Sequence, residues 1–392
     1  MKEEKLTLLG GTLLWFGAAI VITEIMTGAM IEPLGFSKGV LSIILGHLIG
    51  CILFFYFGLI GAKKNKGAME STEIAFGRKG SLFFSLFNVL QLIGWTAIMI
   101  ISGADAMNSA TGVQNTYIWC IVIGCMICIW IFAGLKNISK ISIVAVGLLF
   151  ILSLILSYIV FNGDLSTKNL NESISFGLAM ELSIAMPLSW LPLISDYTKG
   201  TDKPVKLTLI SAISYFLGSC FMYIIGLGAA INFGTSDIIE ILVSSGLGLM
   251  AMIIVIFSTV TTTFLDVYSA GESTVNIFKN ANQKVVCYIV CIIGTIMAMI
   301  FPVFQFESFL LLLGAVFVPM AVVMIADYFI TKNTEFDKTR SKINIVLWVI
   351  GVIVYRIFLS VDTVVGSTIP VIAIILIICS FTGLLRKGIK NV

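Results

Sequence analysis

The segment Trp15-Phe-Gly-Ala-Ala-Ile-Val-Ile-Thr-Glu-Ile-Met-Thr-Gly-Ala29 is apolar enough to cross a membrane, yet it carries one carboxylate, Glu24, near its middle. A carboxylate at membrane depth is costly, so it usually faces a cavity, a partner or a substrate. Glycine, alanine and threonine surround it, and such residues let a helix open locally and offer backbone groups to a ligand. The segment therefore predicts a functional site inside a membrane span.

The composition assigns the whole chain to the polytopic helical membrane proteins. Of the 392 residues 58% are hydrophobic and 11% are charged, and the mean hydropathy is +1.07, far from the values of soluble domains. The eight cysteines are scattered, mostly in apolar runs, and do not indicate a disulfide framework or a metal site. HExxH and Walker A motifs are absent from the sequence, so we expect neither catalytic residues nor a cofactor.

The apolar runs predict an all-α protein with twelve transmembrane helices in a single transmembrane domain, 1–392. Each run approaches the ~20 residues that a membrane span needs, and no long polar segment separates them. The predicted spans are 7–31, 40–62, 81–108, 116–134, 140–161, 173–196, 206–232, 246–270, 284–303, 307–331, 342–360 and 366–386.

The basic residues give this count a topology. With both termini in the cytoplasm, 21 of the 24 lysines and arginines fall on the inner side. The outer side keeps only Lys38, Lys168 and Arg356. This bias is the positive-inside pattern, and it predicts a multi-pass protein of the cell membrane with cytoplasmic ends.

The sixth predicted span repeats the features of the first. It carries a mid-span carboxylate, Glu181, and then Pro187, which removes a backbone donor and crowds the preceding turn. Interrupted helices at corresponding places in two halves of a chain indicate an inverted-repeat transporter site. The alternative is that Pro187 only kinks the helix and Glu181 is paired structurally. Because both spans share the pattern, we favour the site.

The eighth span adds hydroxyl groups and a third acid. Five of the six residues from Ser258 to Thr263 carry a hydroxyl group, and Asp266 follows within one turn. Hydroxyl and carbonyl oxygens suit a hard cation such as Na⁺. The alternative is that these hydroxyls bond back to their own helix carbonyls. No lysine or arginine lies at mid-membrane depth, so the three acids are expected to be protonated, ion-bound or bonded to a substrate that donates N–H groups.

Two further polar residues lie within predicted spans. Trp95 is at mid-span and could stack on a flat heterocycle, although packing is an equal alternative. His47, the single histidine, lies among small and apolar residues. We expect it to make an interhelical hydrogen bond in preference to relaying protons.

The chain resembles the nucleobase-cation-symport-1 permeases, and within them the CytX-type hydroxymethylpyrimidine transporters. The similarity runs over most of the chain and rests on short segments in a shared order. These segments are Trp15-Phe-Gly-Ala18, Thr27-Gly28, Pro33-Leu-Gly35, Gly61-Ala-Lys63, Phe76-Gly-Arg-Lys-Gly-Ser81, Ile93-Gly-Trp95, Ser195-Asp-Tyr-Thr-Lys199, Tyr268-Ser-Ala-Gly271 and Ala326-Asp-Tyr328.

This resemblance implies a LeuT-type five-plus-five inverted repeat, over about 7–161 and 173–331, followed by a C-terminal helix pair at 342–386. The implied mechanism is alternating access. The substrate-binding candidates are Glu24, Trp95, Glu181, Pro187, Ser189, Trp190 and Asp266. The cation-binding candidates are Ile20, Thr23, Ser258, Thr261 and Thr262, where Na⁺ is the possible metal. Asp266 departs from the asparagine of the family, and Trp190 lies closer to Asp196 than the family's stacking tryptophan does.

The acids favour a particular substrate class. A carboxylate accepts a hydrogen bond from an exocyclic amine and, when protonated, donates one to a ring nitrogen, so these acids suit an aminopyrimidine better than uracil. The sequence predicts a secondary active importer of hydroxymethylpyrimidine, a thiamine precursor, coupled to Na⁺ or H⁺. A cytosine or purine permease is the alternative, and an ion channel is the alternative class. The expected partners are the small-molecule substrate and the lipid bilayer, with neither nucleic acid nor an obligatory protein partner.

Overall fold

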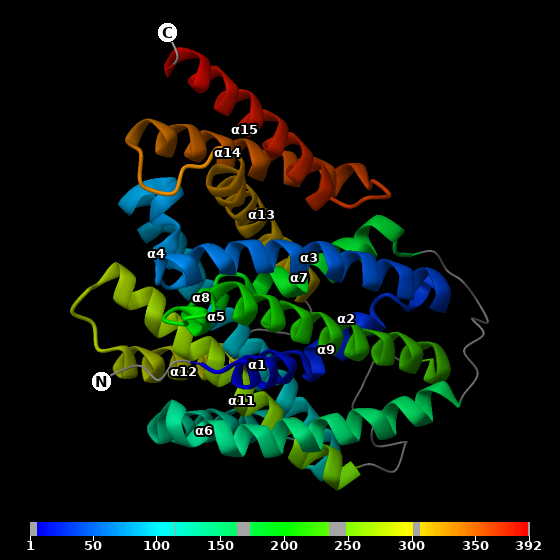
Figure 1. Cartoon of the computed structure of the whole chain (residues 1–392). Coiled ribbons are helices and arrows are strands. Elements are labelled where there is room, and N and C mark those ends of the chain that lie inside the picture. The colour runs from blue at the N-terminus through cyan, green and yellow to red at the C-terminus, as the bar shows by residue number, and fades with distance from the viewer. Residues whose placement is uncertain (1–5, 114, 163–172, 235–247, 301–305, 391–392) are drawn as a thin grey trace.

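A computed structural model describes residues 6–113, 115–162, 173–234, 248–300 and 306–390, and these residues form helices without a β-strand (Figure 1). Lys168, expected on the outer side, lies outside the described residues. The helices are α1 Leu8–Ala19, α2 Ile22–Ala29, η1 Glu32–Leu34, α3 Phe36–Lys64, α4 Ala68–Ser71, α5 Glu73–Thr111, α6 Thr116–Phe161, α7 Phe176–Trp190, α8 Ile194–Thr198, α9 Pro204–Phe233, α11 Gly248–Ile277, α12 Gln283–Ile300, α13 Phe306–Ile325, η3 Ala326–Ile330, α14 Lys338–Val361 and α15 Thr368–Lys390.

The predicted class of protein is confirmed by these helices, whereas the count of twelve spans stays a prediction. Among the described residues seven helices are long and apolar enough to cross a membrane, or eight if the bent pair α1–α2 counts as one span. Helix α6 contains two apolar stretches, 116–133 and 146–161, at the places of the spans expected at 116–134 and 140–161.

The apolar side chains divide between an inner core and a lipid-facing surface. Figure 1 shows α14 and α15 at one side of the bundle and α6 at the opposite side. Large apolar side chains on the outer helices are exposed, such as Phe132 on α6 and Ile300 on α12. Because lipid is as apolar as these side chains, their exposure stabilises the protein in a membrane. The polar residues of interest lie instead on α2, α3, α7, α9 and α11, inside the bundle.

The first predicted span is broken, as the sequence indicates. Helix α1 ends at Ala19, and Val21 is in extended conformation with φ −137° and ψ 157°. Helix α2 then begins at Ile22, and the two helices are bent by 48°. The break frees backbone carbonyl groups at its ends, and it lies within one turn of Glu24.

The sixth span breaks at a different place from the one predicted. Pro187 lies inside α7, which continues to Trp190. The chain leaves the helix only at the turn after Trp190 and resumes in the short helix α8. A proline inside a membrane helix is tolerated when neighbouring helices hold its backbone. Here a Cβ added to Gly50 of α3 would overlap the Pro187 ring, so α3 packs directly on this turn.

Two glycines bring α2 and α9 into backbone contact. A Cβ added at Gly28 would overlap the carbonyl oxygen of Tyr223, and one added at Gly226 would overlap that of Ile25. Small residues allow this close approach between membrane helices. The half-span that carries Glu24 is therefore held tightly against α9.

Gly226→Ala is expected to destabilise the protein by about 1–3 kcal/mol, because the added methyl group meets backbone that cannot rotate away. Thermal unfolding of the detergent-purified protein measures this effect. Gly147→Ala is the matched control, since a Cβ at that position on α6 meets open space. An unchanged unfolding temperature for Gly226→Ala would contradict the backbone contact between α2 and α9.

Candidate functional site

The Glu24 carboxylate lies in the first turn of α2, just after the break, and is fully buried. Its two oxygens each accept a hydrogen bond from α9. Tyr215 donates its hydroxyl to Oε1 at 2.6 Å, and Ser219 lies 2.6 Å from Oε2. Within the described residues Glu24 forms no ion pair with lysine or arginine. The acid is thus compensated by hydroxyl groups alone.

His47 continues this arrangement on α3. Its Nε2 lies 2.6 Å from the Ser219 hydroxyl, and its Nδ1 lies 2.8 Å from the carbonyl oxygen of Ile43. The prediction of an interhelical hydrogen bond for His47 is therefore confirmed. Its partner, Ser219, is 172 residues away in the chain, and no local sequence pattern indicates it.

The helix break faces the hydroxyl residues of α11. Ser258 donates its hydroxyl to the Ile20 carbonyl oxygen at 3.0 Å. Thr261 instead donates its hydroxyl to the Ser258 carbonyl of its own helix. This is the alternative that we gave for the hydroxyl residues of the eighth span. Thr23 and Thr262 are 2% and 3% exposed. The structure thus brings the unwound carbonyl of the first span together with a hydroxyl of the eighth.

Asp266 is the second buried acid of this region. It lies on α11 and is 3% exposed. Its carboxylate has no hydrogen-bond partner within the described residues. A buried polar group without a partner costs free energy. This carboxylate is therefore a candidate to bind a ligand that donates a hydrogen bond.

The two candidate tryptophans lie in different aromatic groups. Trp95 on α5 makes edge contacts with Phe306 and Phe309, at ring-centroid distances of 5.8 and 5.5 Å. Its indole Nε1 is buried without a hydrogen-bond partner among the described residues. Trp190 ends α7 and lies 6.3 Å from the ring of Tyr215, which bonds Glu24. Trp190 is therefore near the Glu24 network.

Glu181 does not join this group. Its carboxylate accepts hydrogen bonds from the Tyr355 hydroxyl at 2.8 Å and the Thr368 hydroxyl at 2.6 Å. It also accepts the backbone N–H groups of Ser367 and Thr368 at the start of α15. An acid at a helix N-terminus is favourable. The expectation that Glu181 and Glu24 face one shared site is not met, and the geometry fits the structural pairing.

The remaining candidates of the sixth span have local contacts. Pro187 packs on Gly50 of α3. The Ser189 hydroxyl donates to the carbonyl oxygen of Met186 in its own helix, at 2.7 Å. The Ser189 carbonyl in turn accepts the amide of Gln91 on α5, at 3.2 Å. These bonds connect α5 to the end of α7.

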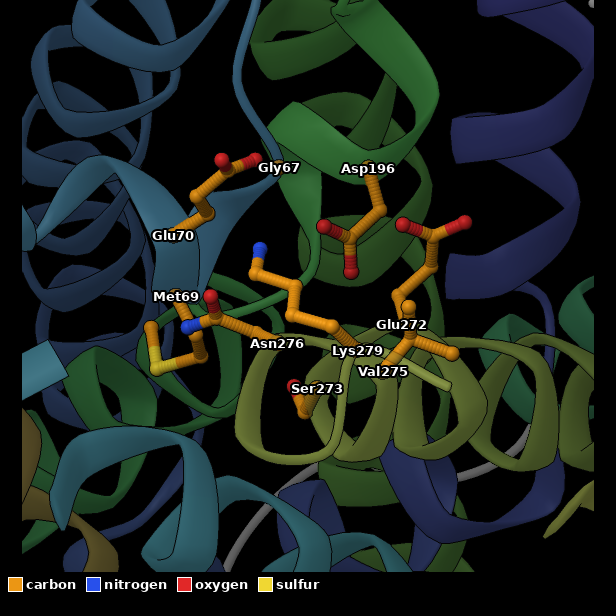
Figure 2. A pocket seen from close by; sticks show the side chains of 9 residues that line it. All are labelled: Gly67, Met69, Glu70, Asp196, Glu272, Ser273, Val275, Asn276 and Lys279. Atoms are coloured by element: carbon orange, nitrogen blue, oxygen red, sulfur yellow. The ribbon is translucent and has the colours of Figure 1, made fainter. Parts of the chain in front are cut away.

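A charged pocket that the sequence did not predict lies at the end of α11, and Asp196, Glu272 and Lys279 are among the residues that line it (Figure 2). Asp196 on α8 accepts the backbone N–H of Ala68 at 2.8 Å, and Lys199 pairs with Glu272 at 2.7 Å. The segment Ser195-Asp-Tyr-Thr-Lys199, which contributes Asp196 and Lys199, is the sequence feature that could have indicated this pocket.

The arrangement of the helices, with its broken first span, is a LeuT-like fold. A nucleobase-cation-symport-1 transporter, Mhp1, solved in a closed conformation with bromovinylhydantoin bound, superposes with a TM-score of 0.77 at 19% identity, over 97% of this chain and 92% of that one. A Na⁺-coupled sialic acid symporter in a substrate-bound outward-open state gives a TM-score of 0.66 at 13% identity, over 96% and 89%.

The sequence comparisons identify the family. Residues 6–342 match the family described as permeases for cytosine/purines, uracil, thiamine and allantoin. The cytosine permease of Escherichia coli K12 is 25% identical over 344 residues, which are 86% of this chain and 81% of that protein. The chain belongs to this family of cytosine/purine permeases, a nucleobase-cation-symport-1 family of transporters and not of enzymes.

Proposed function

We propose that this permease imports an aminopyrimidine by cation-coupled alternating access, with hydroxymethylpyrimidine as the leading substrate. The observation that carries the proposal is a pair of buried acids, Glu24 and Asp266, on elements that adjoin the helix break. An amino group on the ring donates to a carboxylate, whereas the carbonyls of uracil require donors. Thiamine, which contains this pyrimidine, is among the substrates named for the family.

The substrate would lie between these acids and an aromatic face. Asp266 supplies an unpartnered acceptor, and Trp95 supplies a ring with an unpartnered N–H. Trp190 is a second candidate for stacking because its ring is close to Tyr215. Pro187 and Ser189 are supported less well, since their contacts are to α3 and to their own helix.

We propose a cation site at the break, made of the Ile20 carbonyl and hydroxyls of Thr23, Ser258, Thr261 and Thr262. The contact between Ser258 and Ile20 supports it, because these oxygens belong to different spans and meet where α1 has unwound. Oxygen ligands of this type suit Na⁺. We also infer cytoplasmic termini in the cell membrane and two inverted repeats, 7–161 and 173–331, from the basic residues and the fold class.

Uptake into proteoliposomes tests the substrate and the carrier mechanism together. Labelled hydroxymethylpyrimidine, cytosine and adenine are supplied in turn, while Na⁺ and pH are varied separately. We expect uptake of the first, driven by an inward Na⁺ gradient. Preferential uptake of cytosine or adenine would support the alternative permease, and substrate-independent ion current would rule out a carrier.

Ser258→Ala is expected to raise the Na⁺ concentration for half-maximal uptake about tenfold, because losing one oxygen ligand costs on the order of 1.4 kcal/mol of binding. Thr262→Ala is expected to act in the same direction. Thr263→Ala is the matched control, since the Thr263 hydroxyl donates to the Thr259 carbonyl of its own helix at 2.6 Å. An unaltered Na⁺ dependence in both test variants contradicts the site.

A further inference from the structure

One face of α5 passes between the breaks of the first and sixth spans. Gln91, Trp95 and Met99 are spaced four residues apart, so their side chains lie on the same face of this helix. At one end the Gln91 amide donates to the Ser189 carbonyl near the end of α7. At the other end the Thr23 hydroxyl, in the first turn of α2, donates to the Met99 sulfur at 3.8 Å. Trp95 therefore lies between the two breaks.

The helices α5 and α11 pack against each other in antiparallel directions. Asn88 on α5 donates to the hydroxyl of Ser273 on α11 at 2.8 Å. Further along α5, a Cβ added to Gly103 would lie 3.2 Å from the Thr259 side chain. The later contact on α5 thus falls earlier on α11. These two contacts fix which residues of the two helices lie at the same level.

Trp95 and Asp266 share a level in this helix pair. Each is seven residues, or about 10 Å, away from the contact between Asn88 and Ser273. Gln91 lies one turn closer to that contact. The side chains of Gln91, Trp95 and Asp266 are at most 6% exposed. One buried region between α5 and α11 is therefore bordered by an amide, an indole ring and a carboxylate.

Neighbouring groups fix the orientation of the Gln91 amide. The Ser189 carbonyl can only accept a hydrogen bond, so the group that lies 3.2 Å from it is the NH₂ of Gln91. The same NH₂ donates to Asn88 Oδ1 at 2.7 Å. Asn88 is oriented in turn, because its own NH₂ faces the Pro192 carbonyl at 3.5 Å. Both hydrogens of the Gln91 amide are thus used.

The oxygen of this amide is left over. Gln91 Oε1 is buried and has no hydrogen-bond partner within the part of the chain that the structure describes. In the fixed orientation Oε1 can only accept a hydrogen bond. A buried acceptor without a donor costs free energy, and a ligand that donates an N–H group removes this cost. The unpartnered atom therefore points to a ligand that is a donor.

We propose that Gln91 determines substrate specificity, because its Oε1 accepts a hydrogen bond from an exocyclic amino group on the substrate ring. This inference deepens the proposed function and rests on its assignment of an aminopyrimidine. An oxo group at the same ring position places two acceptors face to face, and a hydrogen atom there leaves Oε1 unpaired. Gln91 thus favours the amino compound over both analogues.

Asn88 is a positioning residue for this selection. It does not reach the substrate in this arrangement and acts through the Gln91 amide, whose NH₂ it holds. Without Asn88 Oδ1, the Gln91 amide loses one of the two contacts that orient it. The acceptor then no longer faces the ligand in a single orientation, and the preference for an amino group falls.

Binding of matched ligands tests the inference without transport. Hydroxymethylpyrimidine, cytosine and adenine are each compared with two analogues, in which hydrogen or an oxo group replaces the amino group. Isothermal titration calorimetry of the detergent-purified protein in sodium chloride gives the dissociation constants. In the series that binds best, we expect the amino compound to bind about tenfold more tightly than the hydrogen analogue and about 100-fold more tightly than the oxo analogue.

Gln91→Met keeps the length of the side chain and removes the acceptor. We expect its dissociation constants for the amino compound and the hydrogen analogue to agree within about twofold. Asn88→Ala lowers the wild-type ratio in the same direction. This ratio is the readout, because a purely structural change weakens all the ligands of a series equally. Gln283→Met is the matched control and keeps the wild-type ratio, since the Gln283 amide donates to Glu272 at 3.1 Å, away from this face of α5.

The outcomes separate this inference from the proposed function. Equal binding of the amino compound and its hydrogen analogue by the wild type overturns the inference, and so does a wild-type ratio in Gln91→Met. In both cases binding of hydroxymethylpyrimidine keeps the proposed function. A preference for cytosine or adenine that Gln91→Met loses removes the proposed substrate and keeps the role of Gln91. If Gln91→Met does not fold, an unchanged ratio in Asn88→Ala overturns the inference. Wild-type protein that binds none of these compounds removes both.

Discussion

Glu24→Ala is expected to lower substrate uptake by roughly 100-fold, which corresponds to about 3 kcal/mol. The change removes the buried carboxylate that faces the hydroxyl groups of Tyr215 and Ser219, and it leaves the Tyr215 hydroxyl without its acceptor. It also removes the carboxylate beside the helix break. Uptake into proteoliposomes measures the loss, and the thermal unfolding temperature shows whether the fold is retained.

The matched control for this prediction is Glu32→Ala. Glu32 lies in η1, eight positions further along the chain, and is partly exposed. We expect Glu32→Ala to keep uptake within about twofold of wild type, as surface changes usually have small effects. Near-wild-type uptake by a folded Glu24→Ala protein would show that this acid has no part in transport.

Asp327→Ala is expected to destabilise the protein by about 3–5 kcal/mol, because it leaves the buried charge of Arg340 unpaired. Asp327 lies in η3 and is 1% exposed, and its Oδ1 lies 2.6 Å from Arg340 Nη2. Its Oδ2 accepts the amides of Asn333 and Asn344. The same carboxylate thus holds η3 to α14.

Thermal unfolding and the yield of monodisperse protein measure this change. Glu73→Ala is the control, because the Glu73–Lys66 pair is 3.4 Å long with both side chains about one-third exposed, and such pairs contribute about 0–1 kcal/mol. The double variant Asp327→Leu with Arg340→Met should recover part of the lost stability, since it removes both charges. Equal stability of Asp327→Ala and Glu73→Ala would contradict the prediction.

The first span was predictable from the sequence because its signals are local. The small residues near Glu24 and the cost of an acid in an apolar run both indicate an opening, and α1 ends five residues before that acid. The family resemblance indicated a contact between the first and eighth spans but pointed to Thr261 and Thr262, whereas the hydroxyl that bonds the Ile20 carbonyl is that of Ser258. The type of bond made by His47 was also predictable, whereas its partner was not.

The sixth span shows where local signals end. Glu181 and Glu24 have similar sequence surroundings, yet Glu181 bonds to Thr368, 187 residues further along. Such a partner is fixed by the packing of the C-terminal helices, which no local pattern encodes. The break predicted at Pro187 is wrong for a related reason. Neighbouring helices hold the backbone at this proline, and the helix ends only after Trp190.

The Glu181 contact also changes what the last two helices are. Tyr355 and Thr368 supply three of the four hydrogen bonds to that carboxylate, through two hydroxyls and one backbone N–H. A permease truncated before α14 would therefore expose an acid to hydrocarbon, where nothing replaces those donors. The helices α14 and α15 are therefore a structural part of the transporter and not an optional addition to the other helices. They provide the polar environment that the Glu181 carboxylate needs inside the membrane and that the other helices do not provide.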